Sequence, residues 1–267
     1  MEREMWSGRT SSAHVESVWK IRLAKTGLQA LRSTLTFVSG FSFKGFDASR
    51  HSVVIPEAFV SPWKTDRSFV ETYSKIQGFT TVDMYRCYEL WHLLGQVINL
   101  GGDVLEVGVW RGGTGCLLAA KAQSLNRNAT VFLCDTFSGV VKAGEIDNFY
   151  KGGEHADTSK ALVAGLASKL CLDKVRILEG IFPDETGRII EGNKICFCHI
   201  DVDVYQSAKD VVNWVWPRLQ VGGVIVFDDY GFHHCQGITQ LVDELATKSD
   251  NLMLNNLNGH AVLIRRA

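Results

Sequence analysis

Two stretches decide the fold, Ile195-Cys-Phe-Cys-His-Ile-Asp201-Val-Asp203 and Gly223-Val-Ile-Val-Phe-Asp228-Asp229. Each is a short apolar run that ends in aspartates, and such runs are typical of buried strands in a parallel sheet. Open α/β sheets build their sites at the carboxyl ends of neighbouring strands, so the four aspartates are expected to lie together. Carboxylates in one place repel one another unless a cation lies between them. The two stretches therefore predict an α/β sheet with a metal at its edge.

The composition fits a single large enzyme domain with an appendage. The chain has 267 residues, of which 46% are hydrophobic, and a net charge of −1. This charge gives no indication of a nucleic-acid or membrane partner. The seven cysteines form no metal-type Cys-x-x-Cys pair. Cys134, Cys196 and Cys198, which lie in expected strands, are interpreted as core residues in a reducing compartment. No signal peptide or span-length segment is evident, so we expect a cytoplasmic enzyme.

From Asp103 onward, stretches with a strand pattern alternate with stretches that have a helical pattern. Strands are expected at residues 104–109, 130–134, 175–178, 195–200 and 224–227, with helical patterns between them. This alternation predicts a mostly parallel sheet with helices on both faces. Two closing runs around Asn258-Gly259 predict a hairpin that adds an antiparallel edge.

Residues 1–80 are interpreted as an N-terminal helical extension and lid, and residues 81–267 as the main domain. Helical spacing of apolar residues indicates one or two amphipathic helices in the first fifty residues. They pack on the main domain or serve as a lid or partner contact, and the sequence leaves these alternatives open. Pro56 and Pro62 favour a loop over residues 51–80. A helix is expected from Thr81 to Leu100.

A Gly-rich turn follows the first expected strand, in Leu105-Glu106-Val-Gly108-Val-Trp-Arg-Gly112-Gly113-Thr114-Gly115. Glycines there let a ligand approach the backbone and leave the amides of the helix N-terminus free. The register does not match the G-x-G-x-x-G of a dinucleotide site, so a pyrophosphate is not expected. Glu106 would repel a pyrophosphate but suits an ammonium group. The alternative for Glu106 is a solvated acid at a strand end.

Asp135 ends the next expected strand, where its carboxylate can accept hydrogen bonds from ribose hydroxyls. Taken with Glu106 and Gly108, it describes S-adenosylmethionine, with the amino-acid end at the first turn and the ribose at the second strand. Ser138 and Asp201 complete the residues that we expect to contact this cofactor.

Three of the four aspartates indicate which metal would bind. Asp201, Asp228 and Asp229 offer oxygen ligands only, which suits Mg²⁺ best and also Mn²⁺ or Ca²⁺. The alternative for Asp228-Asp229 is a turn with solvated acids. In an extended strand Asp201 and Asp203 point the same way, about 7 Å apart. One can then bind the metal while the other acts as a general base.

These groups fit methyl transfer from a sulfonium to an oxygen. A phenol ionises near pH 10 and a sugar hydroxyl less readily, and a divalent ion bound to the oxygen lowers that pKa. Asp203 would remove the proton, a step that contributes about 10²–10⁴-fold. His233 and His234 are interpreted either as assistants or as exposed loop histidines, and His199 as a core histidine.

Six segments resemble the macrocin O-methyltransferase family. They are Glu106-Val-Gly-Val-Trp-Arg-Gly-Gly113, Asp135-Thr-Phe-Ser-Gly139, Tyr150-Lys-Gly-Gly-Glu-His155, Gly180-Ile-Phe-Pro-Asp-Glu-Thr186, His199-Ile-Asp-Val-Asp-Val-Tyr205 and Gly222-Gly-Val-Ile-Val-Phe-Asp-Asp-Tyr230. The resemblance runs from about Thr81 to the C-terminus, and residues 1–80 match loosely.

The resemblance implies a class I, Rossmann-like fold for an S-adenosylmethionine-dependent methyltransferase, and often a homodimer or higher homo-oligomer with an N-terminal lid. It implies Mg²⁺ at Asp201, Asp228 and Asp229, and a general base at Asp203. Members of this family methylate sugars or phenolic groups of natural products, so we expect a small-molecule acceptor. The chain departs from the family at residues 140–144, where members commonly carry a Pro-containing acidic loop. The identity of the acceptor and the position methylated therefore stay open.

Two functions are alternatives to a Mg²⁺-dependent O-methyltransferase. A metal-dependent glycosyltransferase would use the Asp201-x-Asp203 pair, but it leaves Glu106 and Asp135 unexplained. A non-catalytic module that binds S-adenosylmethionine would have no use for Asp203 beside a full ligand set.

Overall fold

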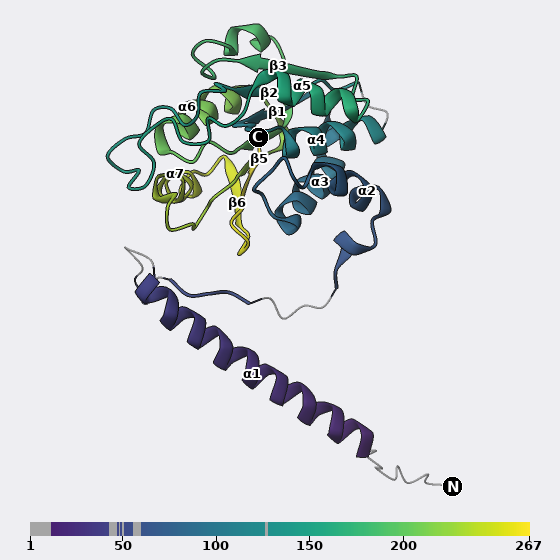
Figure 1. Cartoon of the computed structure of the whole chain (residues 1–267), viewed down its shortest axis with the longest axis vertical. Coiled ribbons are helices and arrows are strands. Elements are labelled where there is room, and N and C mark those ends of the chain that lie inside the picture. The colour runs from purple at the N-terminus through teal and green to yellow at the C-terminus, as the bar shows by residue number, and fades with distance from the viewer. Residues whose placement is uncertain (1–11, 43–46, 48, 50, 56–59, 126–127) are drawn as a thin grey trace. The chain divides into compact units, whose positions relative to one another are not determined.

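The structure is a computed structural model that describes residues 12–42, 47, 49, 51–55, 60–125 and 128–267. The chain divides into two compact units, Met1–Phe59 and Val60–Ala267. In the first unit, α1 (Ser12–Ser42) is one continuous helix (Figure 1). The expected boundary at residue 80 lies inside the second unit, and the lid role of the N-terminal extension stays a prediction.

The second unit is built on a seven-stranded sheet with the order β3-β2-β1-β4-β5-β7-β6. Its strands are β1 (Asp103–Val107), β2 (Val131–Asp135), β3 (Val175–Glu179), β4 (Ile195–Ile200), β5 (Leu219–Phe227), β6 (Asn251–Asn255) and β7 (Ala261–Arg265). Strands β1 to β5 are parallel, and β7 is antiparallel to both β5 and β6. The predicted parallel sheet with an antiparallel closing hairpin is confirmed.

Two layers of helices cover the sheet (Figure 1). They are α2 (Arg67–Ile76), α3 (Met84–Val97), α4 (Gly113–Ser124), α5 (Lys160–Lys169), α6 (Tyr205–Val215) and α7 (Gln236–Ala246), with short 3₁₀ turns η1 (Pro62–Lys64), η2 (Ile98–Leu100), η3 (Gly187–Ile190) and η4 (Trp216–Arg218). Side chains of α6 and α7 share one core cluster with the sheet, and those of α3, α4 and α5 share another. Each face of the parallel strands is therefore buried, as their continuous apolar runs require.

The prediction of a loop at residues 51–80 is wrong. Residues 51–80 are not a loop throughout, because α2 forms within them. The side chain of Asp66 accepts a hydrogen bond from the Phe69 amide and caps this helix, and Phe69 and Ile76 are buried on its inner face. Both prolines precede the helix, so neither interrupts it.

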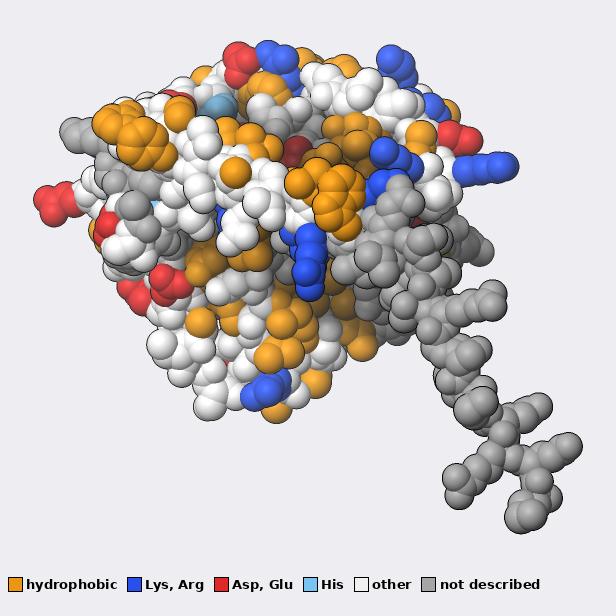
Figure 2. Space-filling view, turned by 90° about the horizontal axis from the view of Figure 1, so that it is seen from below, with side chains coloured by type: hydrophobic (Ala, Val, Ile, Leu, Met, Phe, Trp, Pro, Cys, Tyr) orange, Lys and Arg blue, Asp and Glu red, His pale blue; other side chains and the backbone are white. Residues whose placement is uncertain are grey.

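The described surface agrees with the near-neutral composition. On the face in Figure 2, basic and acidic side chains are spread between apolar ones. Among the described residues, no helix combines the length and apolarity that crossing a bilayer requires.

Backbone hydrogen bonds continue past the strands and bring three functional positions to one edge. The amide of Gly108 donates a hydrogen bond to the carbonyl oxygen of Cys134. In the same way the amide of Asp201 donates to Val107 and that of Asp228 to Ile200, and each of the three bonds is 2.9 Å long. β1 therefore ends at Val107, two residues earlier than predicted, because Gly108 turns the chain with a φ of 85°. A Cβ at Gly108 would lie 1.7 Å from the carbonyl oxygen of Asp201. The sheet edge thus demands glycine at this position.

This close approach can be tested with two matched substitutions. Gly101 also has a positive φ, of 75°, but a Cβ there would meet nothing within 4 Å. With a ψ of 162°, Gly101 has a backbone conformation that is essentially confined to glycine, so we expect Gly101→Ala to cost about 1–3 kcal/mol for the backbone alone. Gly108→Ala should cost a further 1–3 kcal/mol or so for the clash. Urea denaturation of both variants checks this, and equal losses would contradict the close packing of Gly108 on Asp201.

Candidate active site

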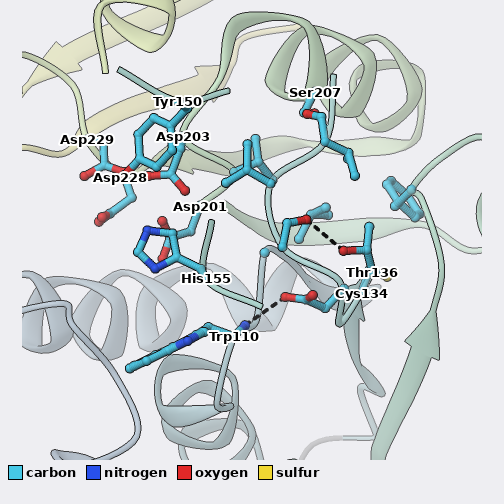
Figure 3. A pocket seen from close by; sticks show the side chains of 18 of the residues that line it. Trp110, Cys134, Thr136, Tyr150, His155, Asp201, Asp203, Ser207, Asp228 and Asp229 are labelled. Carbon is cyan, nitrogen blue, oxygen red and sulfur yellow. Dashed lines mark hydrogen bonds between the residues drawn. The ribbon is translucent and has the colours of Figure 1, made fainter. Parts of the chain in front are cut away.

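A cavity of about 350 Å³ opens at the carboxyl ends of the parallel strands (Figure 3). Its size is within the range of small-molecule sites, about 300–1,000 Å³. Acidic and aromatic side chains share its lining. Its lining residues include Trp110, Asp135, Tyr150, His155, Asp201, Asp203, Asp228, Asp229, Phe232 and His234.

Asp135 organises one end of the cavity. Its Oδ2 accepts hydrogen bonds from the amides of Val109 (2.6 Å) and Trp110 (2.8 Å), and its Oδ1 accepts one from the Phe137 amide at 2.7 Å. A carboxylate has about four acceptor positions, so one remains for a ligand. Asp135 therefore both shapes the Gly-rich turn and faces the cavity. Gly108 also lines it.

Glu106 and Ser138 do not line the cavity. Glu106 is fully buried, and its Oε1 lies 2.8 Å from Nδ1 of His199. Val107 lines the cavity instead, since successive residues of a strand face opposite sides. The hydroxyl of Ser138 donates to the carbonyl of Thr136. Direct cofactor contacts by Glu106 and Ser138 stay predictions, and His199 is the buried core histidine that was expected.

Three of the four aspartates converge. Carboxylate oxygens of Asp201, Asp203 and Asp229 all lie within 4.8 Å of one another. Asp203 and Asp229 have positive φ values of 64° and 63°, a conformation that aspartate adopts at a cost and that often marks functional sites. Burial raises the pKa of Asp201 and of Asp229, and the charges of neighbouring aspartates raise both further. These carboxylates fit a site for a proton or a cation.

Asp228 is held apart from this trio by Arg86 and His260. Its Oδ2 accepts a hydrogen bond from Arg86 at 2.5 Å, and its Oδ1 lies 2.8 Å from Nε2 of His260. Burial alone would raise the pKa of Asp228, but His199, His260 and Arg86 lower it below its ordinary value. Asp228 still borders the cavity, so the structure brings all four predicted acids to one site in two different environments.

The loop before α5 supports Asp203. The hydroxyl of Tyr150 hydrogen-bonds Asp203, whose pKa is raised chiefly by burial. Asp147 on the same loop is buried, and its Oδ1 accepts a hydrogen bond from the Tyr205 amide at the start of α6 (3.0 Å). Asp203 and the first residue of α6 are thus both held by one loop.

Sequence reasoning gave no role to several residues of the site. Tyr150 and His155 stand in one of the quoted segments, which was the available signal. No local sequence pattern indicated a role for Arg86 or His260, because their partners lie far away along the chain. Of the two loop histidines, His234 lines the cavity and its pKa is lowered by burial.

Comparison with known proteins identifies the family. The family model for macrocin-O-methyltransferases matches residues 64–266. Mycinamicin III 3''-O-methyltransferase of Micromonospora griseorubida is 34% identical over 216 residues, which cover 74% of this chain and 82% of that protein. Demethyldecarbamoylnovobiocin O-methyltransferase of Streptomyces niveus is 29% identical over 163 residues, or 57% of this chain and 61% of that protein.

Solved structures agree with the fold. The O-methyltransferase NovP superposes with a TM-score of 0.61 at 25% identity, covering 71% of this chain and 83% of that one. The calicheamicin methyltransferase CalS11 has a TM-score of 0.60 at 17% identity, covering 79% and 99%, and shows the fold alone. These matches confirm the class I fold and contradict the glycosyltransferase alternative. The chain belongs to the macrocin-O-methyltransferase family and is an S-adenosylmethionine-dependent O-methyltransferase.

Proposed function

We propose that this protein is a Mg²⁺-dependent O-methyltransferase that moves the methyl group of S-adenosylmethionine to a hydroxyl of a sugar or phenolic natural product. The observation that carries the proposal is the cluster of Asp201, Asp203 and Asp229 in the same cavity as Asp135. The cluster supplies metal ligands and a base, and Asp135 supplies an acceptor for ribose hydroxyls. The positive sulfonium suits a cavity lined by carboxylates.

The residues present fit the cofactor at the Asp135 end. Asp135 keeps an acceptor position after binding three backbone amides, and Gly108 leaves the backbone of the turn open to a ligand. We assign direct contacts to Asp135, Gly108 and Asp201. Glu106 and Ser138 would affect the cofactor site indirectly. Glu106 contacts His199, and Ser138 contacts Thr136.

The donor set also fits a hard divalent cation. Asp201 and Asp229 offer oxygens close to each other, and Mg²⁺ commonly uses one or two carboxylates plus water and substrate oxygens. Asp228 would be the third ligand, because each of its oxygens has one partner and retains a second lone pair. When bound, the ion would lower the pKa of the acceptor hydroxyl and fix its direction.

Asp203 is the proposed general base. Tyr150 donates to Asp203 and orients it, as a third group commonly orients a catalytic base. Asp203 would take the proton of the acceptor hydroxyl while the oxygen attacks the methyl carbon. The carbon–sulfur bond breaks as the carbon–oxygen bond forms, and the sulfonium leaves as a neutral thioether.

Two relatives support the acceptor class. They are a mycinamicin III 3''-O-methyltransferase and a demethyldecarbamoylnovobiocin O-methyltransferase by name. Tyr150, Phe182 and Phe232 contribute aromatic rings to the lining of this cavity, which suits a ring-shaped acceptor. We also propose that the protein is a cytoplasmic homo-oligomer. The exposed apolar side chains of α1, among them Phe37 and Phe41, support the self-association. Light scattering would check the assembly.

The base can be tested with Asp203→Asn. The amide cannot take a proton, so we expect turnover to fall by about 10²–10⁴-fold, with cofactor binding by calorimetry within a few-fold of wild type. Asp173→Asn, at an exposed position, is the matched control. Unchanged turnover in Asp203→Asn would remove Asp203 as the base.

Metal removal tests the cation. Turnover should disappear in excess chelator and return when Mg²⁺ is added beyond it. Asp201→Asn and Asp228→Asn should both lose this response, because each removes a charged ligand. A Mg²⁺ titration of activity at fixed cofactor measures it. A variant that responds like wild type would show that its aspartate is not a ligand, and activity that survives the chelator would rule out the metal.

A further inference from the structure

Asp228, the buried His260 and the partly buried Glu89 form a line of hydrogen-bonded side chains that joins α3 to the turn between β6 and β7. We propose that Glu89 and His260 are positioning residues that hold Asp228 at the metal edge of the cavity and so raise the affinity for a divalent cation. This inference rests on the proposed function, because it concerns the same cation.

The first observation is the geometry of His260. Its Nε2 lies 2.8 Å from Oδ1 of Asp228, and its Nδ1 lies 2.8 Å from Oε2 of Glu89. Each ring nitrogen thus lies at hydrogen-bonding distance from one carboxylate, and the imidazole bridges Asp228 and Glu89. His260 has no exposed surface and Asp228 is 4% exposed, so the contact between these two side chains is shielded from water.

The fold explains why these residues meet. The antiparallel register pairs Phe227, the last residue of β5, with Ala261, the first residue of β7. Asp228, which follows β5, therefore lies beside His260, which precedes β7. The turn is fixed against β5 by a hydrogen bond from the Tyr230 amide to the Gly259 carbonyl, 2.8 Å long.

Glu89 is itself immobilised. Besides His260, it accepts hydrogen bonds from the side-chain amides of Asn256 and of Asn258, the latter at 2.9 Å. Three donors from one turn therefore converge on one carboxylate of α3. Such a fixed partner restricts the rotation of the histidine ring, and the ring in turn restricts Asp228.

The same helix holds the other oxygen of Asp228. Arg86, three residues before Glu89, donates to Oδ2 and is itself bound through Nε to Asp83 at 2.8 Å. One face of α3 thus fixes both oxygens of Asp228, one directly and one through His260. A ligand that is oriented in advance loses less conformational entropy when the ion binds. Loss of such supporting partners typically costs about 10–100-fold in metal affinity or activity.

A second reading of the cluster is a transition-metal site. Ligand atoms of His199, Asp228 and His260 lie within 4.8 Å of one another, and Nε2 of His199 has no hydrogen-bond partner among the described residues. However, the 2.8 Å contact of His260 with Asp228 is an ordinary hydrogen bond. It favours positioning, and elemental analysis separates the two readings.

The test is direct cation binding to the full chain after removal of metals by chelator. Calorimetric titration with Mg²⁺, and with Mn²⁺ as a second probe, should show a dissociation constant raised about 10–100-fold in His260→Gln and in Glu89→Gln. Turnover at saturating Mg²⁺ and S-adenosylmethionine affinity should stay within a few-fold of wild type. His92→Gln, at an exposed position on α3, should change nothing. Glu89→Gln leaves His260 in place, so it keeps the test valid if His260→Gln does not fold.

The outcomes are distinct. Wild-type affinity in both folded variants would overturn this inference and leave the proposed function standing. A wild-type protein that binds neither cation would overturn the proposed metal and this inference together. Stoichiometric zinc or iron in the purified protein, lost in His260→Gln, would make His260 a metal ligand and overturn its role as a positioning residue.

Discussion

Electrostatic repulsion among four aspartates at two adjacent strand ends is the constraint on which the site depends. The structure reduces this repulsion in two ways. Asp228 contacts Arg86 and His260 through short buried hydrogen bonds, and its pKa is lowered. Arg86 lies farther from Asp229, at 3.8 Å, and burial raises the pKa values of Asp201, Asp203 and Asp229. The trio therefore favours an added cation or proton, whereas Asp228 is stabilised as a carboxylate by its own neighbours.

Two neighbouring residues illustrate how the backbone creates this difference. Asp228 continues the hydrogen-bond ladder of β5, and its side chain faces Arg86 and His260. Asp229 adopts a left-handed conformation, and its carboxylate joins Asp201 and Asp203. Adjacent carboxylates thus acquire opposite pKa shifts. A regular strand ending would send them to opposite faces of the sheet, so the strained residue serves the site.

The sequence predicted the parts of the molecule that depend on local pattern. Continuous apolar runs located β4 and β5, and the rule about strand ends placed Asp201, Asp203, Asp228 and Asp229 at one edge. The helix α2 was missed because two prolines outweighed a cap and a short apolar face. The orientation of Glu106 was also not predictable, since the choice between the cavity and His199 depends on where β1 ends.

The ion pairs of Asp228 lay beyond sequence reasoning for a different reason. Arg86 is 142 residues away and His260 is 32 residues away, and no local spacing relates them. They meet because α3 packs against the sheet and β7 pairs with β5 in one register. Shifting that register by one residue would turn His260 to the other face. The environment of Asp228 is therefore set by the packing of α3 and β7 on the sheet, and the C-terminal hairpin belongs to the active site as much as to the edge of the sheet.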